Sequence, residues 1–316
     1  MKIHLICLND DCGQRLEFEN SRGGSRAACM HCLSELAVPR DDEAVGRELD
    51  GYNVRELMGV GGAGKVYRAR QLASGEDFAL KILSRSLADD EVLVKRFERE
   101  AKVTSTMDHP NIVRGYGLMQ SHGFVYLIME LIEGETARHR IERKGKLGIP
   151  ETLKIALSVV RALKHAYQHG IVHRDIKPGN ILVDHTGRIK LADFGLVRME
   201  DASMQLTRGA FALGSPLYSS PEQSADARDA DHRSDIYALG VSLMHMLTGN
   251  HPFSGSSLRE IVLNHTAEAM RSGAELGTPL PPKLEELLQK MTAKRPADRV
   301  QNHDDLEREI EGLIEG

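Results

Sequence analysis

Residues 59–66 read GVGGAGKV, and glycines packed this closely beside a lysine are typical of two unrelated phosphate-binding loops. Gly59, four residues, Gly64 and Lys65 nearly match a P-loop, in which the glycines follow a buried strand and open a helix. Under the pattern G-x-G-x-x-G-x-V, the same residues match a glycine-rich hairpin that covers the phosphates of a nucleotide. The residues that follow decide between the two.

The sequence after the glycines favours the hairpin. A P-loop has Ser or Thr after its lysine to bind magnesium, whereas Lys65 is followed by Val66, whose side chain has no oxygen. The stretch VYRARQLASGEDFALKIL then alternates in short apolar runs around Ser74 and Gly75, as two strands joined by a turn do. We therefore expect the glycines at the tip of a β-hairpin. Taken alone, such a tip is equally consistent with a simple flexible turn.

Further motifs follow in order along the chain. Lys81 lies in FALK, on the strand after the hairpin, and a helical pattern comes next, DDEVLVKRFEREAKVTSTMDHPNIV. Glu100 of this helix is the carboxylate expected to pair with Lys81, and Glu98 is the alternative. The later motifs are HRDIKPGN (173–180), DFG (193–195), GSPLYSSPE (214–222), SDIYALG (234–240) and KRPADR (294–299).

Together these motifs resemble those of the eukaryotic-like serine/threonine protein kinases of bacteria, from about Tyr52 to the end of the sequence. The resemblance implies an α+β, bilobal protein kinase fold over residues 51–316, with a β-rich N-lobe at about 51–130 and a helical C-lobe at about 133–316. It also implies an enzyme that transfers the γ-phosphate of ATP to Ser or Thr hydroxyls of protein substrates, including its own. Mg²⁺ or Mn²⁺ would be the cofactor.

The resemblance assigns the chemistry to the two central motifs. Asp175 is expected to accept the proton of the incoming hydroxyl, and Lys177 to neutralise the moving phosphoryl group. Asn180 and Asp193 are expected to bind magnesium, because hard cations prefer oxygen ligands. A lysine two residues after the catalytic aspartate is the pattern of serine/threonine kinases, and tyrosine kinases usually place other residues there.

The resemblance also outlines an ATP site. Lys81, held by Glu100, would bind the α- and β-phosphates, and adenine would hydrogen-bond to the backbone between Glu130 and Ile132. For Met129, at the back of this pocket, filling the core is an equally good interpretation. The expected ATP-binding residues are Gly59, Val60, Gly61, Gly62, Ala63, Gly64, Val66, Ala79, Lys81, Met129, Glu130 and Ile132.

Regulation is expected in the segment after DFG. In such kinases the arginine before the catalytic aspartate, here Arg174, commonly receives a phosphate from this segment. Thr207 is the first candidate acceptor and Ser203 the second, because a phosphate there could form charge-assisted hydrogen bonds. Alternatively, this segment is a polar loop that receives no regulatory phosphate.

Two departures from the family pattern touch no catalytic group. Ser215 stands where these kinases often have Thr, and it still offers a hydroxyl. SPE replaces the usual APE, which leaves Glu222 available to pair with Arg299. Both departures concern substrate preference only. Asp235 resembles the aspartate with which the family steadies the backbone of the catalytic loop.

All four cysteines lie in the first 38 residues, at Cys7, Cys12, Cys29 and Cys32. The spacing C-x4-C, sixteen residues, C-x2-C predicts a zinc-ribbon-like module at residues 1–38, with four thiolates closing a structural Zn²⁺ site. Such a small segment would need the metal to fold. His31 could replace a cysteine, and a redox pair at Cys29 and Cys32 or unligated thiols are the alternatives. The charged, proline-led stretch at 39–50 reads as a linker.

Composition limits the partners. The 316 residues carry a net charge of −5, so no basic surface suggests nucleic acid. No apolar stretch is long enough to span a bilayer, and the N-terminus reaches acidic residues before a signal peptide could form. We therefore expect a cytoplasmic protein with no membrane segment in this chain.

A pseudokinase scaffold, whose N-terminal module recruits partners, is the alternative function. Pseudokinases usually lose the lysine, the catalytic aspartate or the magnesium-binding aspartate, whereas this chain retains Lys81, Asp175 and Asp193. An active enzyme is therefore the expectation. Bacterial kinases of this type often continue into a membrane helix and a sensor domain, so a longer protein is also compatible with the sequence.

Overall fold

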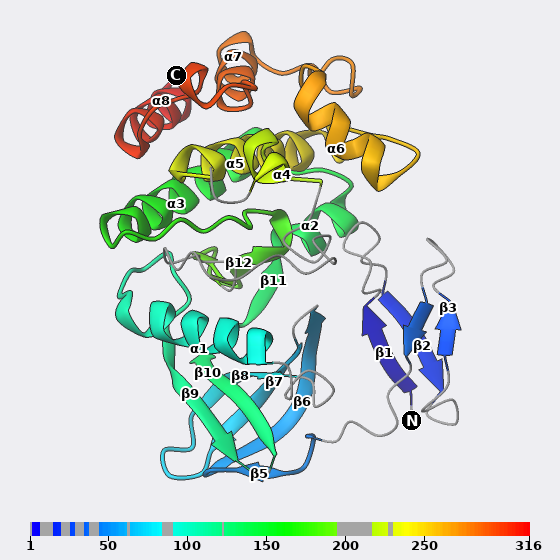
Figure 1. Cartoon of the computed structure of the whole chain (residues 1–316), viewed down its shortest axis with the longest axis vertical. Helices are drawn as coiled ribbons and strands as arrows, with labels where there is room; N and C mark the ends of the chain where they lie inside the picture. The colour runs from blue at the N-terminus through cyan, green and yellow to red at the C-terminus, as the bar shows by residue number, and fades with distance from the viewer. Residues whose placement is uncertain are drawn as a thin grey trace. The chain divides into compact units, whose positions relative to one another are not determined.

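The computed structural model describes residues 2–6, 15–19, 26–28, 35–37, 44–61, 64–83, 91–121, 123–194, 217–226 and 230–316. The chain divides into two compact units. The first comprises residues 1–106 with 114–131, and the second residues 107–113 with 132–316. Strands dominate the first unit and helices the second (Figure 1).

Two short antiparallel hairpins stand at the N-terminus. β1 (Lys2–Ile6) pairs with β2 (Arg15–Glu19), and β3 (Arg26–Ala28) pairs with β4 (Glu35–Ala37). The expected zinc ligands lie outside the described part of the chain: Cys7, Cys12, Cys29 and Cys32. The alternative ligand, His31, also lies outside it. The zinc-ribbon hypothesis stays a prediction.

A six-stranded antiparallel sheet forms the body of the first unit, in the order β5-β6-β7-β8-β10-β9. Its strand β10 is a continuous apolar run because both of its faces are buried. Tyr126 and Ile128 pack in one core cluster, whereas Val125 and Leu127 pack in the other. The strands are β5 (Glu48–Leu49), β6 (Tyr52–Gly61), β7 (Gly64–Gln71), β8 (Asp77–Leu83), β9 (Gly115–Ser121) and β10 (Phe124–Glu130).

Helix α1 (Glu91–Thr106) covers one of these core clusters through Phe97 and Ala101. It approaches β9 so closely that a Cβ atom on Gly115 would lie 2.3 Å from Oγ1 of Thr104. Glycine at this position therefore permits the contact between helix and sheet.

The core of the sheet begins before β6. Ala44 and Leu49 are almost fully buried in it, beside Val54, and both lie inside the stretch expected to be a linker. Tyr126 donates a hydrogen bond of 2.6 Å to the carboxylate of Asp50, which ties the same stretch to β10. Residues 44–50 are thus part of the folded unit.

The second unit is built around α5 (His232–Thr248), whose residues are buried from Ser234 to Thr248. This agrees with a sequence that is apolar nearly all round. The helix begins at the N-cap Asp231 and ends at Gly249, in the left-handed region with φ 74°. The other helices are α2 (Ala137–Lys144), α3 (Ile149–Gln168), α4 (Pro221–Ala225), α6 (Leu258–Ala267), α7 (Pro282–Met291) and α8 (His303–Glu315).

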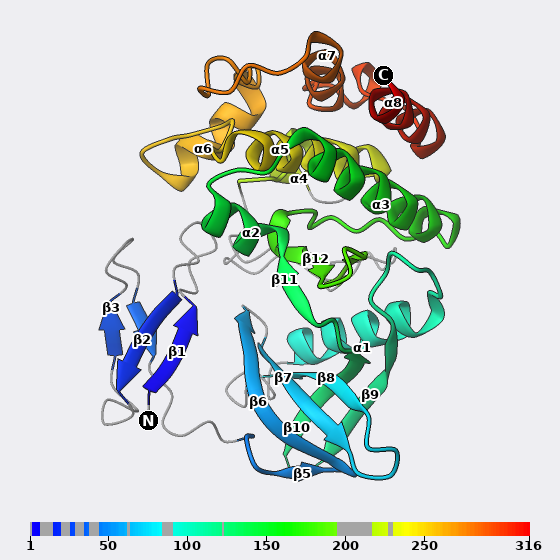
Figure 2. The same cartoon turned by 180° about the vertical axis from the view of Figure 1, so that it is seen from behind.

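Helix α3 is amphipathic and buries a stripe that includes Leu153, Ala156 and Val160. Helix α8 lies beside α3 (Figure 2). Between the two helices, Arg161 forms ion pairs with Glu307 and Glu311. A three-stranded sheet of β11 (Gly134–Thr136), β12 (Ile181–Asp184) and β13 (Ile189–Leu191) completes the unit. Within the described part of the chain, no helix combines the length and apolar character needed to cross a membrane. The cytoplasmic location expected from the sequence stays a prediction.

Candidate active site

In the first unit, β8 and α1 bring a lysine and a glutamate together. The ammonium group of Lys81 donates hydrogen bonds of 2.7 and 2.9 Å to the two carboxylate oxygens of Glu100. Both residues are buried, with exposed fractions of 9% and 3%, so the ion pair neutralises two charges that are shielded from water. Glu98, the alternative partner, is exposed.

The glycine-rich stretch forms the hairpin of β6 and β7, with Gly59 opposite Val66 and Gly61 opposite Gly64. Val66 therefore continues a strand, whereas a P-loop would continue into a helix at this point. A Cβ atom on Gly64 would lie 2.2 Å from the carbonyl oxygen of Ile82, so the pairing of β7 with β8 requires glycine. Gly62 and Ala63, at the tip, lie outside the described residues.

Strand β10 carries two of the residues expected to contact the nucleotide, Met129 and Glu130. Met129 lies opposite Ala79 in the register and packs partly buried against the cluster that contains Leu83 and Phe97, which supports its role as a core residue. The N–H of Glu130 donates to the carbonyl of Arg114 at 2.9 Å. Val60 lies opposite Lys65 in the hairpin, and Ile132 belongs to the second unit.

In the second unit, the loop after α3 gathers three polar side chains. Nδ2 of Asn180 donates to the backbone oxygen of Asp175 at 2.8 Å and to its Oδ2 at 3.0 Å. Nζ of Lys177 lies 3.1 Å from the same Oδ2. Two donors thus orient one carboxylate, and the side chain of Asp175 is 13% exposed.

Asp193 follows β13 and is joined to this loop through the preceding residue. The N–H of Ala192 donates to the carbonyl of Asn180 at 2.9 Å. Asp193 adopts a left-handed conformation with φ 67°, and Phe194 is fully buried against the ring of His173, 4.5 Å between ring centroids. Non-glycine residues in this conformation persist only where their surroundings hold them.

The backbone of the loop is fixed from α5. The carboxylate of Asp235 accepts the N–H of His173 at 2.8 Å and the N–H of Arg174 at 2.7 Å. Burial raises the pKa of Asp235 above its usual value, and the positive charges of its two neighbours and their N–H groups oppose that rise. The role expected for Asp235 matches this geometry.

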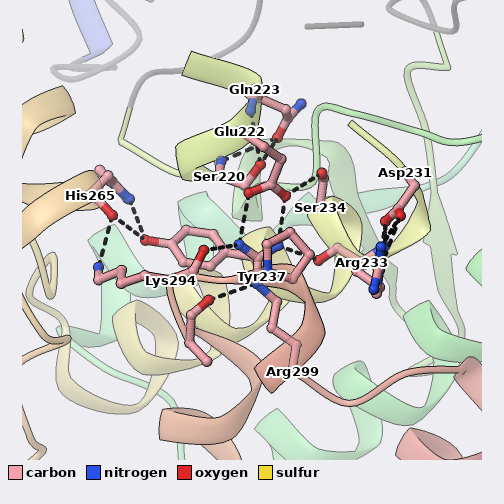
Figure 3. Close-up of polar contacts among 12 residues, drawn as sticks. Ser220, Glu222, Gln223, Asp231, Arg233, Ser234, Tyr237, His265, Lys294 and Arg299 are labelled. Carbon is pink, nitrogen blue, oxygen red and sulfur yellow. Dashed lines mark hydrogen bonds and ion pairs between the residues drawn. The ribbon is translucent and has the colours of Figure 1, made fainter. Parts of the chain in front are cut away.

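A buried ion pair connects α4 to the residues after α7 (Figure 3). Arg299 donates from Nη1 and Nη2 to the two carboxylate oxygens of Glu222 at 2.6 and 2.8 Å. Ser234 adds a third hydrogen bond of 2.6 Å to Glu222. Burial acts to raise the pKa of Glu222, but the hydrogen bonds from Arg299 and Ser234 outweigh it, and the pKa lies below its usual value.

Sequence reasoning missed one residue beside this loop. Nε2 of Gln223 donates to the carbonyl oxygen of Arg174 at 2.9 Å. Gln223 follows the motif that ends at Glu222 and is part of none itself, and no spacing rule connects it to a residue 49 positions earlier. The candidate regulatory sites Thr207 and Ser203 lie outside the described residues, whereas Arg174 is described and donates from Nη2 to the carbonyl of Ala230.

The residues present fit a magnesium–nucleotide complex. Nδ2 of Asn180 is used by Asp175, so the amide oxygen of Asn180 faces away from that carboxylate. Amide and carboxylate oxygens, here of Asn180 and Asp193, are the ligands that Mg²⁺ prefers. In the described part of the chain, no group of three or more His, Cys, Asp or Glu side chains is arranged to hold a metal ion. A site with these two protein ligands would leave further positions to phosphate oxygens and water.

Comparisons with known proteins agree with this geometry. The chain is 40% identical over 267 residues to the serine/threonine-protein kinase PrkC of Bacillus subtilis, covering 84% of this chain and 41% of that protein. It is 36% identical over 261 residues to PknA of Mycobacterium tuberculosis, covering 81% and 59%. The chain spans about half the length of the curated relatives it matches.

A solved structure and a family model give the same assignment. The crystal structure of a point mutant of the Mycobacterium tuberculosis PknI kinase domain superposes with a TM-score of 0.65 at 28% identity, covering 86% of this chain and 97% of that one. The family model described as "Protein kinase domain" matches residues 52–309, which is most of the sequence. The chain belongs to the protein kinase family.

Proposed function

We propose that the chain is an active serine/threonine protein kinase that transfers the γ-phosphate of ATP to Ser and Thr hydroxyls of proteins, including its own. The observation that carries the proposal is the carboxylate of Asp175, held by Asn180 and flanked by Lys177. The relatives named above are serine/threonine kinases by name. A lysine at position 177 agrees with that acceptor class.

Phosphoryl transfer needs positioning and charge neutralisation more than covalent chemistry. Asp175 accepts the proton of the acceptor hydroxyl, since Asn180 fixes the direction of its carboxylate. Lys177 lies beside the same carboxylate and offers a positive charge to the phosphoryl group as it moves. One loop thus supplies both the acceptor for the proton and the charge for the phosphoryl group.

The remaining residues bind the nucleotide. Asn180 and Asp193 would hold Mg²⁺ or Mn²⁺, which neutralises phosphate charge when it is bound. Lys81 would hold the α- and β-phosphates, and the ion pair with Glu100 keeps its ammonium group oriented. Gly59, Gly61 and Gly64 permit a backbone close enough to cover phosphates.

A transfer assay with radiolabelled ATP tests the proposal. The wild-type chain is expected to label itself and an acceptor protein on serine and threonine only, as phosphoamino-acid analysis would show, and Asp175→Asn is expected to give no label. If Asp175→Asn produced as much label as the wild type, the proposal would be contradicted. No transfer by the wild type, with ATP still bound in calorimetry, would instead support the pseudokinase scaffold.

The N-terminal residues extend the proposal to a structural Zn²⁺ held by Cys7, Cys12, Cys29 and Cys32. The first pair falls between the paired strands β1 and β2 in the sequence, and the second between β3 and β4. Two closely spaced pairs of cysteines are the ligand pattern of structural zinc sites. One equivalent of zinc is expected by elemental analysis, and Cys29→Ser should abolish it. A chain without stoichiometric zinc would refute the module.

A further inference from the structure

The backbone of Arg174 is held on both sides by different helices. Its N–H donates to Asp235 of α5 at 2.7 Å, and its carbonyl accepts from Gln223 of α4 at 2.9 Å. Arg174 has φ 66°, in the left-handed region, which is costly for a residue with a side chain. The peptide group that carries this carbonyl is the one that connects Arg174 to Asp175.

The amide of Gln223 has one possible orientation. The backbone N–H of Ser220 donates to Oε1 at 3.2 Å, and a donor requires an acceptor opposite it. The carbonyl of Arg174 is an acceptor and requires the NH₂ group. The hydroxyl of Ser220 also donates to Oε1 at 3.1 Å and accepts the N–H of Gln223 at 3.4 Å, so the start of α4 holds the side chain in place.

We propose that Gln223 is a positioning residue for phosphoryl transfer: its amide fastens the peptide between Arg174 and Asp175 to the start of α4. The inference rests on the proposed kinase function. Asp235 restrains the loop through the N–H groups of His173 and Arg174, and Gln223 adds the restraint on the carbonyl side. Without it, Arg174 can leave its left-handed conformation, and the carboxylate of Asp175 turns with the peptide.

The same contact couples the catalytic loop to the segment before α4. Ser220 is fully buried, and Leu217 and Tyr218 just before it are nearly so. His265 of α6 reaches the carbonyl of Leu217 at 3.0 Å, and Tyr237 of α5 in turn contacts His265 (Figure 3). Packing of residues 217–223 therefore positions Gln223, which in turn positions the residue before the catalytic base.

The test uses Gln223→Glu, which keeps the acceptor for Ser220 but sets a carboxylate oxygen against the carbonyl of Arg174. Gln223→Met removes all three side-chain hydrogen bonds, two to Ser220 and one to Arg174, without adding charge. Gln289→Glu is the matched control, because Nε2 of Gln289 also donates to a backbone carbonyl, that of Met270, at 3.0 Å. Two quantities are measured on the full chain. The first is the steady-state rate of phosphate transfer to a serine peptide that the wild type phosphorylates. The second is the rate of hydrogen exchange at the backbone amides of His173 and Arg174.

Both Gln223 variants are expected to lose kcat on the order of tenfold, with KM for ATP nearly unchanged, because one hydrogen bond that orients the base is lost. Amide exchange at His173 and Arg174 should accelerate in both variants and stay at the wild-type rate in Gln289→Glu. A kcat within twofold of wild type, or an equal loss in the Gln289 control, would overturn the inference. If the wild type transfers no phosphate, the proposed function fails. Independently of that result, unchanged amide exchange in the Gln223 variants would show that Gln223 does not restrain the peptide between Arg174 and Asp175.

Discussion

Arg299 and Glu222 form a bidentate ion pair, with hydrogen bonds of 2.6 and 2.8 Å. The two residues are 77 positions apart in the sequence. The guanidinium is fully buried, and it also donates to the backbone oxygens of Ala293, Lys294 and Arg233. Its carbon atom Cζ lies over the ring of Tyr237, 4.8 Å from the centroid. The pair therefore fastens α4 to the helical core of the second unit.

Removal of Arg299 is expected to destabilise the second unit strongly. Arg299→Met leaves Glu222 buried without its partner and should lower the free energy of unfolding by roughly 3–5 kcal/mol, measured by chemical denaturation. Arg308→Met is the control, since its ion pair with Asp305 lies at the surface and should contribute less than about 1 kcal/mol. If both variants lost a similar amount of unfolding free energy, the buried pair of Arg299 and Glu222 would be no more important for stability than a surface ion pair.

The buried pair of Lys81 and Glu100 predicts a large effect on catalysis. Lys81→Met removes the cation expected to hold the phosphates and should lower kcat/KM for ATP by about 10²–10³-fold. Glu98→Gln, on the exposed side of α1, should leave kcat/KM unchanged. Near wild-type transfer by Lys81→Met would show that this lysine does not hold the phosphates.

Buried His265 predicts a loss of stability in mild acid. Burial lowers the pKa of His265 to about 3, and the positive charge of Lys294 adds to this effect. The unfolded chain therefore takes up a proton near pH 6.5 while the folded chain does not, so unfolding becomes more favourable as pH falls from 6.5 towards 3.

Replacement of this imidazole should flatten the pH dependence of stability. His265→Gln is expected to reduce the slope of unfolding free energy against pH by up to about 1.4 kcal/mol per pH unit between pH 6 and 4. The amide of glutamine can still donate to Leu217, so the fold should persist. Denaturant titrations at several pH values give the slope. An unchanged slope would show that His265 does not stay neutral in the folded chain.

Phosphorylation of the segment before α4 is expected to raise activity. Thr207 is the first candidate and Ser203 the second, and a phosphate on either could bind the guanidinium of Arg174. Mass spectrometry of the chain after incubation with ATP should find phosphate on Thr207, and Thr207→Ala should lower transfer to other proteins. Active protein with neither residue modified would contradict the prediction.

Local patterns predicted much of the fold. The alternation after Val66 placed β7 and β8, and the apolar sequence of α5 predicted a helix buried on all sides. Such elements are determined by residues close in sequence. The pairing of Glu222 with Arg299 was expected from the family motifs, and the structure contains it.

Other features could not be read from the sequence because they depend on distant contacts. Ala44 and Leu49 are isolated apolar residues among charged ones, and only the sheet of the first unit explains their burial. Gln223 is uncharged and belongs to no motif. Its hydrogen bond to the carbonyl of Arg174 forms only because the tertiary structure places α4 beside the loop after α3. The burial of Phe194 against His173 likewise joins two segments through tertiary structure.

A single-turnover measurement of phosphoryl transfer tests the proposed role of Asp175 as the base. Wild type and Asp175→Asn would be mixed with radiolabelled ATP, Mg²⁺ and an acceptor peptide, with ATP affinity measured in parallel by calorimetry. Asp175→Asn is expected to transfer phosphate at least about 10²-fold more slowly than the wild type, with ATP affinity unchanged. If the variant transferred phosphate within a few-fold of the wild-type rate, Asp175 would not be the base.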